Sequence, residues 1–281
     1  MALKKYKPTS PSQRQRSNVH YKKLLSQGNE PKKSLVVRVK STAGRNNRGV
    51  ITTRHREQGH KKMYRVVDFR QEKFEIPGTV KTIEYDPYRS AFISLVSYVD
   101  GEWRYVLAPK DIKVGDKIVV SEKGEVLPGN RFPLKNIPIG YLVHNVELRP
   151  GTGGKIARSA GSAVEVLGSA NGFTDLRFSS KEVRRVPENC YASIGQISNT
   201  EHNLVNIGKA GRSRWMGRRP TVRGSAMNPV DHPYGGGEGV QPRGTKRPKT
   251  KWGKVTGGRK TRDKKKWSSK LIVKRRSSKR K

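Results

Sequence analysis

Residues 92–107 read FISLVSYVDGEWRYVL, and this stretch near the middle of the 281-residue chain decides the fold. Its two halves, 92–99 and 102–107, are rich in β-branched and aromatic residues. Such side chains favour strands, and Asp100-Gly101 between them is the strongest short-range signal for a tight hairpin turn. The stretch therefore predicts two adjacent antiparallel strands.

Short runs with the same strand character continue on both sides of this hairpin. Turn residues separate them, among them Lys123-Gly124, Pro128-Gly129 and the Gly-rich clusters 150–154 and 168–172. The expected strands are 80–85, 117–120, 125–127, 141–148, 163–167, 175–178, 182–186 and 191–197. No window keeps a helical period over three turns. This spacing predicts an all-β core of two small barrels with about five strands each.

Charge divides the chain into a balanced middle and two basic ends. The chain has 61 Lys and Arg against 22 Asp and Glu, a formal net charge of +39. Residues 61–200 hold 21 basic and 16 acidic side chains, residues 1–60 hold 15 and 2, and residues 240–281 hold 19 and 1. We therefore expect the middle to fold by itself, the flanks 1–34 and 240–281 to be disordered in isolation, and the protein to bind a polyanion.

Composition disfavours several classes of protein. Cys190 is the single cysteine, which excludes intramolecular disulfides and cysteine-cluster zinc sites and fits a reducing compartment. No run approaches the roughly 18 apolar residues of a membrane span, and no apolar stretch follows the basic first residues as in a secretory signal. Pro8 and Pro11 would interrupt the amphipathic helix of a transit peptide, so the cytoplasm is expected rather than an organelle. The six histidines lack metal-ligand spacing and predict no protein-only metal site.

The segment 209–239, KAGRSRWMGRRPTVRGSAMNPVDHPYGGGEG, has too few apolar residues for a core of its own. Arginine offers forked hydrogen bonds that match phosphate oxygens and a plane that stacks on bases, while glycine allows close backbone approach. The pattern predicts contact with structured nucleic acid, against the alternative of a solvated loop. The residues expected to bind RNA here are Lys209, Arg212, Arg214, Trp215, Arg218, Arg219 and Arg223.

His232 is a weak candidate for a catalytic residue. Histidine is easily tuned for proton transfer near neutral pH, and Gly235, Gly236 and Gly237 permit close backbone approach to a reactive centre. The sequence supplies no nucleophile or oxyanion donors beside it, and the adjacent Asp231 would point away in an extended loop. We therefore expect His232 and these glycines to contact RNA, with acid–base catalysis as the alternative.

Residues 151–155, GTGGK, resemble a phosphate loop, but Ile156 stands where Ser or Thr should bind Mg²⁺. A loop whose amides face an RNA phosphate is expected instead, with Lys155 and Arg158 among the RNA contacts. The basic N-terminal segment adds a further group of expected contacts, namely Arg45, Arg48, Arg54, His55, Arg56, His60 and Lys61. No cofactor is expected, and Mg²⁺ is expected only through the bound RNA.

Segments along almost the whole chain resemble the L-two family of large-subunit ribosomal proteins, in its bacterial type. They are 44–56 (GRNNRGVITTRHR), 64–69, 83–88, 98–109, 150–161, 192–195 with 199–202, 208–223 and the segment 209–239. The resemblance implies an oligonucleotide-binding-like barrel followed by an SH3-like barrel, with both ends extended into ribosomal RNA. The domains expected are a basic N-terminal extension with the first strands at 1–60, the first barrel at 61–128, the second at 129–200, and a Gly/Arg-rich loop with a basic C-terminal extension at 201–281.

The resemblance also implies partners and a place in the ribosome. The partners are large-subunit ribosomal RNA, neighbouring ribosomal proteins and, at a bridge, the small subunit. The place is near the peptidyl transferase region, with support for transfer-RNA placement. The chain departs from the family at Glu57-Gln58-Gly59, where a glycine run is usual, and at Tyr234, where a second histidine is usual.

Three functions from different classes remain open on the sequence alone. They are a structural RNA-binding component of the large ribosomal subunit, a general nucleic-acid-condensing protein, and a peptidyl transferase acting through His232. The β-rich core and the preference for Arg over Lys between 209 and 223 disfavour simple condensation, which needs only charge. His232 lacks the rest of an active site, so the first function is favoured.

Overall fold

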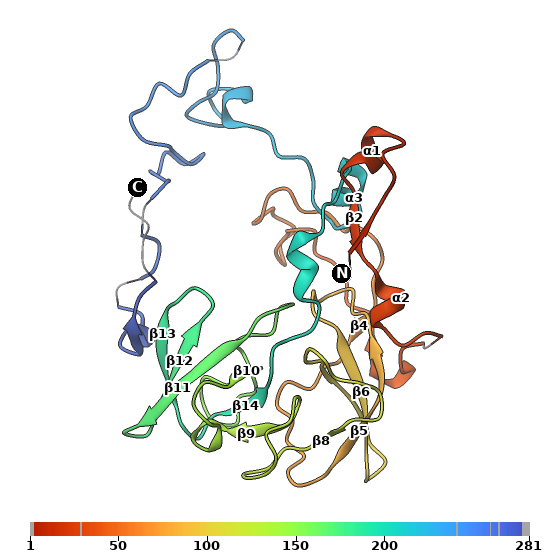
Figure 1. The fold of residues 1–281 in the computed structure, drawn as a ribbon. Coiled ribbons are helices and arrows are strands. Elements are labelled where there is room, and N and C mark those ends of the chain that lie inside the picture. The colour runs from red at the N-terminus through yellow and green to blue at the C-terminus, as the bar shows by residue number, and fades with distance from the viewer. Residues whose placement is uncertain (1–2, 29, 240, 259, 264, 277–281) are drawn as a thin grey trace. The chain divides into compact units, whose positions relative to one another are not determined.

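The computed structural model describes residues 3–28, 30–239, 241–258, 260–263 and 265–276 (Figure 1). The chain divides into two compact units. We call Met1–Lys40, Lys61–Arg212 and Lys270–Lys281 the core unit, and Ser41–His60 with Ser213–Ser269 the arginine unit. Part of the basic carboxyl-terminal run, namely 264 and 277–281, lies outside the described residues.

The predicted hairpin is confirmed within a four-stranded antiparallel sheet of the core unit. The sheet has the order β7-β6-β5-β8, with β5 at Gly78–Glu84, β6 at Ile93–Tyr98, β7 at Trp103–Leu107 and β8 at Lys117–Ile118. Ser97 pairs with Trp103, and Gly101 takes a φ of +82° in the turn between β6 and β7. The Asp-Gly signal therefore placed the turn correctly because glycine reaches this region of φ without strain.

A second, seven-stranded antiparallel sheet follows in the order β15-β13-β12-β11-β10-β14-β9. The strands are β9 Arg131–Pro133, β10 Leu142–His144, β11 Val164–Ala170, β12 Phe173–Phe178, β13 Val183–Pro187, β14 Tyr191–Ile194 and β15 Ile272–Lys274. Figure 1 shows β11, β12 and β13 as a meander. The prediction of a strand at 125–127 is wrong, since this segment is a loop. The Asn130 side chain holds the loop by donating to the Glu125 carbonyl at 3.0 Å.

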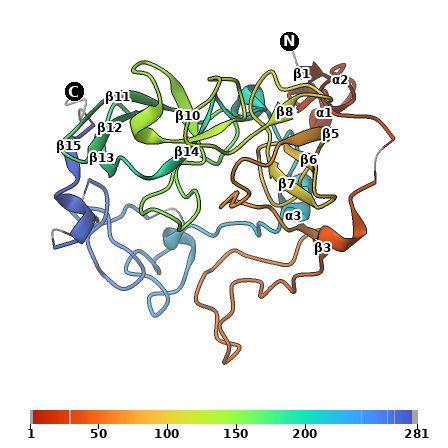
Figure 2. The same ribbon diagram turned by 90° about the horizontal axis from the view of Figure 1, so that it is seen from below.

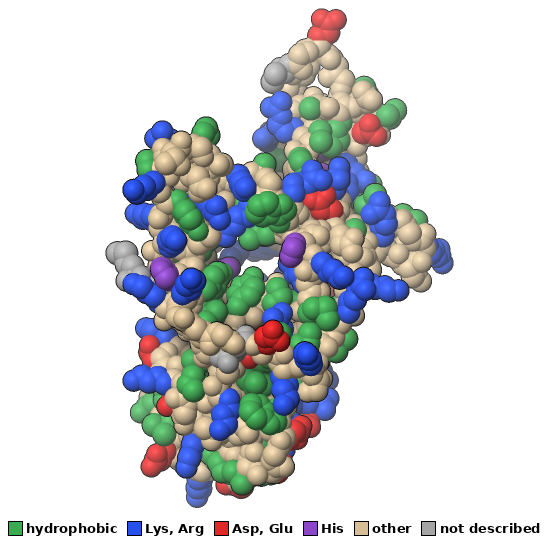
Figure 3. Space-filling model, turned by 90° about the vertical axis from the view of Figure 1, so that its right-hand side faces the viewer, with side chains coloured by type: hydrophobic (Ala, Val, Ile, Leu, Met, Phe, Trp, Pro, Cys, Tyr) green, Lys and Arg blue, Asp and Glu red, His purple; other side chains and the backbone are tan. Residues whose placement is uncertain are grey.

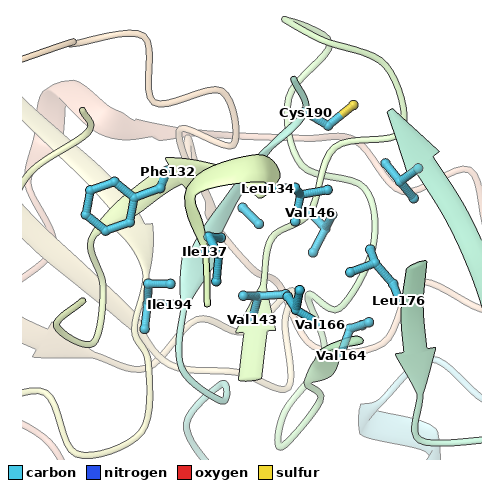
Figure 4. Packing of buried hydrophobic residues seen from close by; sticks show 12 residues of the cluster. Phe132, Leu134, Ile137, Val143, Val146, Val164, Val166, Leu176, Cys190 and Ile194 are labelled. Carbon is cyan, nitrogen blue, oxygen red and sulfur yellow. The ribbon is translucent and has the colours of Figure 1, made fainter. Parts of the chain in front are cut away.

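Each sheet buries its own apolar cluster. Beside the seven-stranded sheet, Val143, Val164, Val166 and Leu176 are 0–2% exposed and point toward one another, as Figure 4 shows. The four-stranded sheet contributes Val80, Val96, Val106 and Ile118 to a second cluster with Phe92 and Ala108. The all-β core expected from alternating strand signals is confirmed, with its apolar side chains turned inward.

The N-terminal flank, expected as an arm, completes the second of these clusters. β1 (Leu3–Lys5) pairs with β2 (Ser17–Val19), and Val19 is only 4% exposed among the core residues. Two single-turn helices, α1 (Pro11–Arg14) and α2 (Tyr21–Leu24), lie in the same flank, and β3 (Val36–Val37) pairs with β4 (Tyr64–Arg65). The burial of Val19 could not be predicted from the low apolar content of the flank, because a single valine in the right position can complete a small core.

The remaining helical elements are short. They are α3 (Ala210–Trp215) and the 3₁₀ turns Lys33–Leu35, Leu134–Asn136, Thr200–Leu204, Gly224–Ala226 and Trp267–Ser269. Within the described ranges, every helix is too short to cross a membrane.

Candidate nucleic-acid interface

Two segments that are far apart in the sequence pair within the arginine unit. Arg56 and Arg218 form an antiparallel bridge, and the Arg219 amide donates to the His55 carbonyl at 3.1 Å. The His60 amide donates to the Trp215 carbonyl at 2.8 Å. The structure therefore brings together two groups of sequence-predicted RNA contacts that lie about 160 positions apart, as read from these pairs.

Two glycines allow this close backbone approach. Gly59 has a φ of +67°, and a Cβ built on it would lie 2.6 Å from the Trp215 carbonyl oxygen. Gly217 has a φ of +80°, and its Cβ would lie 2.7 Å from the Glu57 carbonyl oxygen. Any other residue at either position would strain the backbone and clash with it. These glycines serve contact within the chain.

Glu57 holds two of the predicted arginines. Its carboxylate accepts from Arg214 (Nη2 to Oε2, 2.8 Å) and lies 3.5 Å from Nη1 of Arg219. The hydrogen bond from Arg214 is the main reason that the pKa of Glu57 lies below its usual value. The family departure at Glu57 therefore has a structural role, since one carboxylate orients two exposed guanidinium groups.

Other predicted arginines of this unit stay available to a partner. All are exposed and none pairs with a described carboxylate: Arg45, Arg48, Arg54, Arg56, Arg218 and Arg223. The loop that carries Arg48 is ordered by the Asn46 side chain, whose Oδ1 accepts from the Arg48 and Val50 amides at 3.0 Å each. Figure 3 shows Lys and Arg side chains spread over one face of the molecule, with fewer acidic ones between them. Exposed arginines that pair with no described carboxylate suit a polyanion.

His232 is packed as a structural residue. Its Nδ1 accepts from the Tyr234 amide at 3.1 Å, and its own amide donates to the Asn228 carbonyl at 3.3 Å. A Cβ on Gly224 would lie 2.5 Å from Nδ1, so the half-buried ring rests directly against that glycine. No described carboxylate, hydroxyl or thiol side chain forms a hydrogen bond with the ring. The arrangement therefore offers no catalytic set around His232.

The triple glycine is also shaped by contacts within the chain. A Cβ on Gly235 would lie 2.2 Å from the Asn228 carbonyl oxygen, one on Gly236 would lie 2.6 Å from Pro229, and one on Gly237 would lie 2.5 Å from Gln241. Tyr234, the residue that replaces the usual histidine, accepts a hydrogen bond from the Lys249 amide through its hydroxyl. It thereby anchors the following segment to the loop.

The expectation that the amides of 151–155 face a phosphate is wrong. The Gly151 and Gly153 amides donate to the buried Glu147 carboxylate at 3.1 Å each. The Gly154 amide donates to the Phe69 carbonyl at 2.9 Å, and the Lys155 amide to the Val146 carbonyl at 2.8 Å. These amides are satisfied by the protein, since the buried carboxylate accepts from the first two and backbone carbonyls accept from the other two.

The side chains of Lys155 and Arg158 instead reach a cleft in the core unit, which we call the basic cleft. Its volume is about 610 Å³, and it is lined by Tyr64, Phe69, Tyr88, Arg89, Lys155, Arg158 and Phe178 together with serines and small apolar residues. No described Asp or Glu lines it. Arginine and aromatic side chains together suit a nucleotide, which is both anionic and flat.

Aromatic contacts fix the cations of the basic cleft. The Arg158 guanidinium carbon lies 4.2 Å from the Phe69 ring centroid. Arg89 pairs with the buried Asp86 and donates to the Tyr64 hydroxyl at 2.8 Å. Sequence reasoning missed Tyr64, Tyr88 and Arg89, although the neighbouring aromatic and basic residues in Tyr64-Arg65 and Tyr88-Arg89 could have indicated them.

Three further predicted contacts belong to the core unit. Arg212 belongs to the core unit, is half-buried, and donates from Nη1 to the carbonyls of Ser17 and Asn206 at 3.4 Å each, so it ties α3 to β2. Lys61 and Lys209 are exposed residues of the core unit. Over the described ranges, no group of three or more His, Cys, Asp or Glu could hold a metal ion.

Two family models match the chain. The model described as Ribosomal Proteins L2, RNA binding N-terminal domain matches residues 32–120, and that described as Ribosomal Proteins L2, C-terminal domain matches residues 127–253. Together they cover most of the sequence, and the all-β structure with its two sheets is consistent with the expected oligonucleotide-binding-like and SH3-like barrels. The chain therefore belongs to the ribosomal protein L2 family, whose members are RNA-binding structural constituents of the large ribosomal subunit.

Proposed function

We propose that the chain binds large-subunit ribosomal RNA through the exposed arginines of the arginine unit and through the basic cleft. The pairing of 55–60 with 214–219 is the observation that supports this most directly. It gathers arginines on a backbone that two glycines and Glu57 fix in place. A prearranged set of guanidinium groups binds crowded phosphates without the ordering cost of a flexible loop.

Arg218 provides the test, because it is exposed and pairs with no described carboxylate. Binding of the full chain to large-subunit ribosomal RNA is measured over a range of salt concentrations. We expect Arg218→Gln to weaken binding and to reduce the slope of log affinity against log salt by about 1. Arg218→Lys should keep the slope but lower the affinity, since lysine cannot donate the bidentate hydrogen bonds of a guanidinium group.

Arg185 is the matched control, as an exposed arginine of β13 that already pairs with Asp175 at 3.1 Å. Arg185→Gln should leave the slope unchanged. An unchanged slope for Arg218→Gln would contradict the proposal. Equal affinity of the wild-type chain for duplex DNA and for the ribosomal RNA would favour the nucleic-acid-condensing function instead.

We further propose that His232 holds the loop 228–237 in shape near the peptidyl transferase centre, and that RNA performs the chemistry. The intrachain contacts of His232 support this role. His232→Gln keeps a hydrogen-bonding side chain that does not titrate. Subunits with full occupancy of this variant should keep most of their single-turnover peptide-transfer rate. A drop of about 100-fold or more, the scale of general acid–base catalysis, would restore His232 as a catalyst.

The remaining parts of the proposal rest on the family resemblance. They are contact with the small subunit at a bridge, support for transfer-RNA placement, a bacterial-type ribosome in the cytoplasm, and Mg²⁺ that arrives with the RNA. Depletion of the protein from reconstituted large subunits should therefore impair their association with small subunits. Normal association of depleted particles would count against the bridge.

A further inference from the structure

Two exposed tyrosines of the core unit lie side by side, and neither is among the RNA contacts discussed so far. Tyr21 is 37% exposed and Tyr85 is 46% exposed. Their ring centroids are 5.2 Å apart and the ring planes meet at 62°. Tyr21 comes from the N-terminal flank, whereas Tyr85 follows β5, so tertiary structure alone creates the pair.

Backbone contacts hold the two rings in place. The segment after α2 is bonded to β5 in both directions, since the Ser26 amide donates to the Ile83 carbonyl (3.1 Å) and the Ile83 amide donates to Ser26 Oγ (3.0 Å). Figure 2 draws α2 close to the sheet that contains β5. The Tyr21 ring also packs against Phe92, at 6.2 Å between centroids. A rigid aromatic surface binds a flat ligand with little loss of side-chain entropy.

Cations lie near the pair. Lys22 and Lys23 are exposed on the same helical turn as Tyr21. Burial raises the pKa of both tyrosine hydroxyls, and the Asp86 carboxylate raises that of Tyr85 further, whereas Arg212 is close enough to both hydroxyls to lower their pKa. The acidic residues on either side of Tyr85 are turned inward. Glu84 accepts from the Tyr105 hydroxyl at 2.8 Å, and Asp86 pairs with Arg89.

We propose that Tyr21 and Tyr85 form a stacking platform for an unpaired nucleotide of structured RNA, with its phosphate held by Lys22, Lys23 or Arg212. Exposed aromatic rings stack on any base, and the neighbouring cations supply the electrostatic attraction that RNA requires. The inference rests on the proposed RNA-binding function and extends it. It makes the N-terminal flank part of the RNA surface through its aromatic residues, in addition to its charge.

Tyr85→Leu tests the platform, because it removes the ring and leaves the net charge unchanged. We expect the affinity of the full chain for large-subunit ribosomal RNA to fall about tenfold, the scale of one stacked base, with an unchanged salt slope. Tyr85→Phe should bind within about twofold of wild type, since it keeps the ring. Tyr141, which is 44% exposed, is the matched control, and Tyr141→Leu should have no effect.

Ultraviolet cross-linking of the wild-type complex supplies a second readout that needs no variant. We expect nucleotide adducts on the peptides that contain Tyr21 or Tyr85. Wild-type affinity for Tyr85→Leu, or a complex without these adducts, would overturn the platform. Failure of the wild-type chain to prefer the ribosomal RNA over duplex DNA would instead overturn the proposed function itself. Adducts with a peptide partner, in the absence of RNA adducts, would also overturn the platform.

Discussion

Glu147 is the residue whose removal we expect to damage the core unit most. Its side chain is buried and accepts four hydrogen bonds, from Arg131 Nη2 (3.1 Å) and from the amides of Gly151 (3.1 Å), Gly153 (3.1 Å) and Tyr191 (3.3 Å). Arg131 is completely buried. Burial lowers the pKa of its guanidinium, and Glu147 opposes that shift.

The expected magnitude follows from this burial. Glu147→Ala leaves a buried guanidinium without its counterion, which costs about 3–5 kcal/mol of unfolding free energy. Glu147→Gln keeps the shape and one acceptor oxygen, so we expect a smaller loss of about 1.5–3 kcal/mol. Glu165 offers the control, because its ion pair with Arg177 is partly exposed, and Glu165→Ala should cost less than about 1 kcal/mol.

The assay is urea unfolding of the full chain followed by far-ultraviolet circular dichroism, with linear extrapolation to water. Loss of the acceptor should also loosen the loop 151–155 and weaken RNA binding through Lys155. A Glu147→Ala protein within about 1 kcal/mol of wild type would refute the reasoning, since 1 kcal/mol is the upper range of a surface pair. Equal losses for Glu147→Ala and Glu165→Ala would refute it as well.

The remaining predictions concern the core unit. Burial lowers the pKa of His144 to about 4 from 6.5, so between these pH values only the unfolded chain takes up the proton. The free energy of unfolding should therefore fall by about 3 kcal/mol as the pH drops from 6.5 to 4. The urea midpoint of His144→Gln should depend less on pH than that of the wild type. The fragment 61–200 lacks Val19 and should unfold at a lower urea concentration than the fragment 1–212. Equal midpoints would show that the N-terminal flank does not stabilise the core. Burial raises the pKa of Cys190 to about 12, so a thiol reagent should label it only at the rate of unfolding, and fast labelling of folded protein would contradict its burial.

Local sequence patterns were sufficient for much of the fold. The hairpin 92–107 was correctly predicted because strand preference and turn chemistry act between neighbours along the chain. The strand β9 was missed, since its three residues include Pro133 and a buried Arg131, which carry no apolar alternation. The segment 125–127 was wrongly predicted as a strand because no local pattern reveals the hydrogen bond from Asn130.

The sequence by itself determined the β-rich core and the polyanionic character of the partner, and it predicted the arginines that would contact this partner. Net charge and strand alternation are properties of composition and of neighbouring residues, so they can be read from the sequence without knowledge of the tertiary structure. Only the tertiary structure decided that Glu57 orients Arg214, that Glu147 satisfies the amides of the glycine loop, and that Tyr21 meets Tyr85. Each of these arrangements depends on a contact through space, and the partners of such a contact leave no periodic or compositional trace in the chain between them.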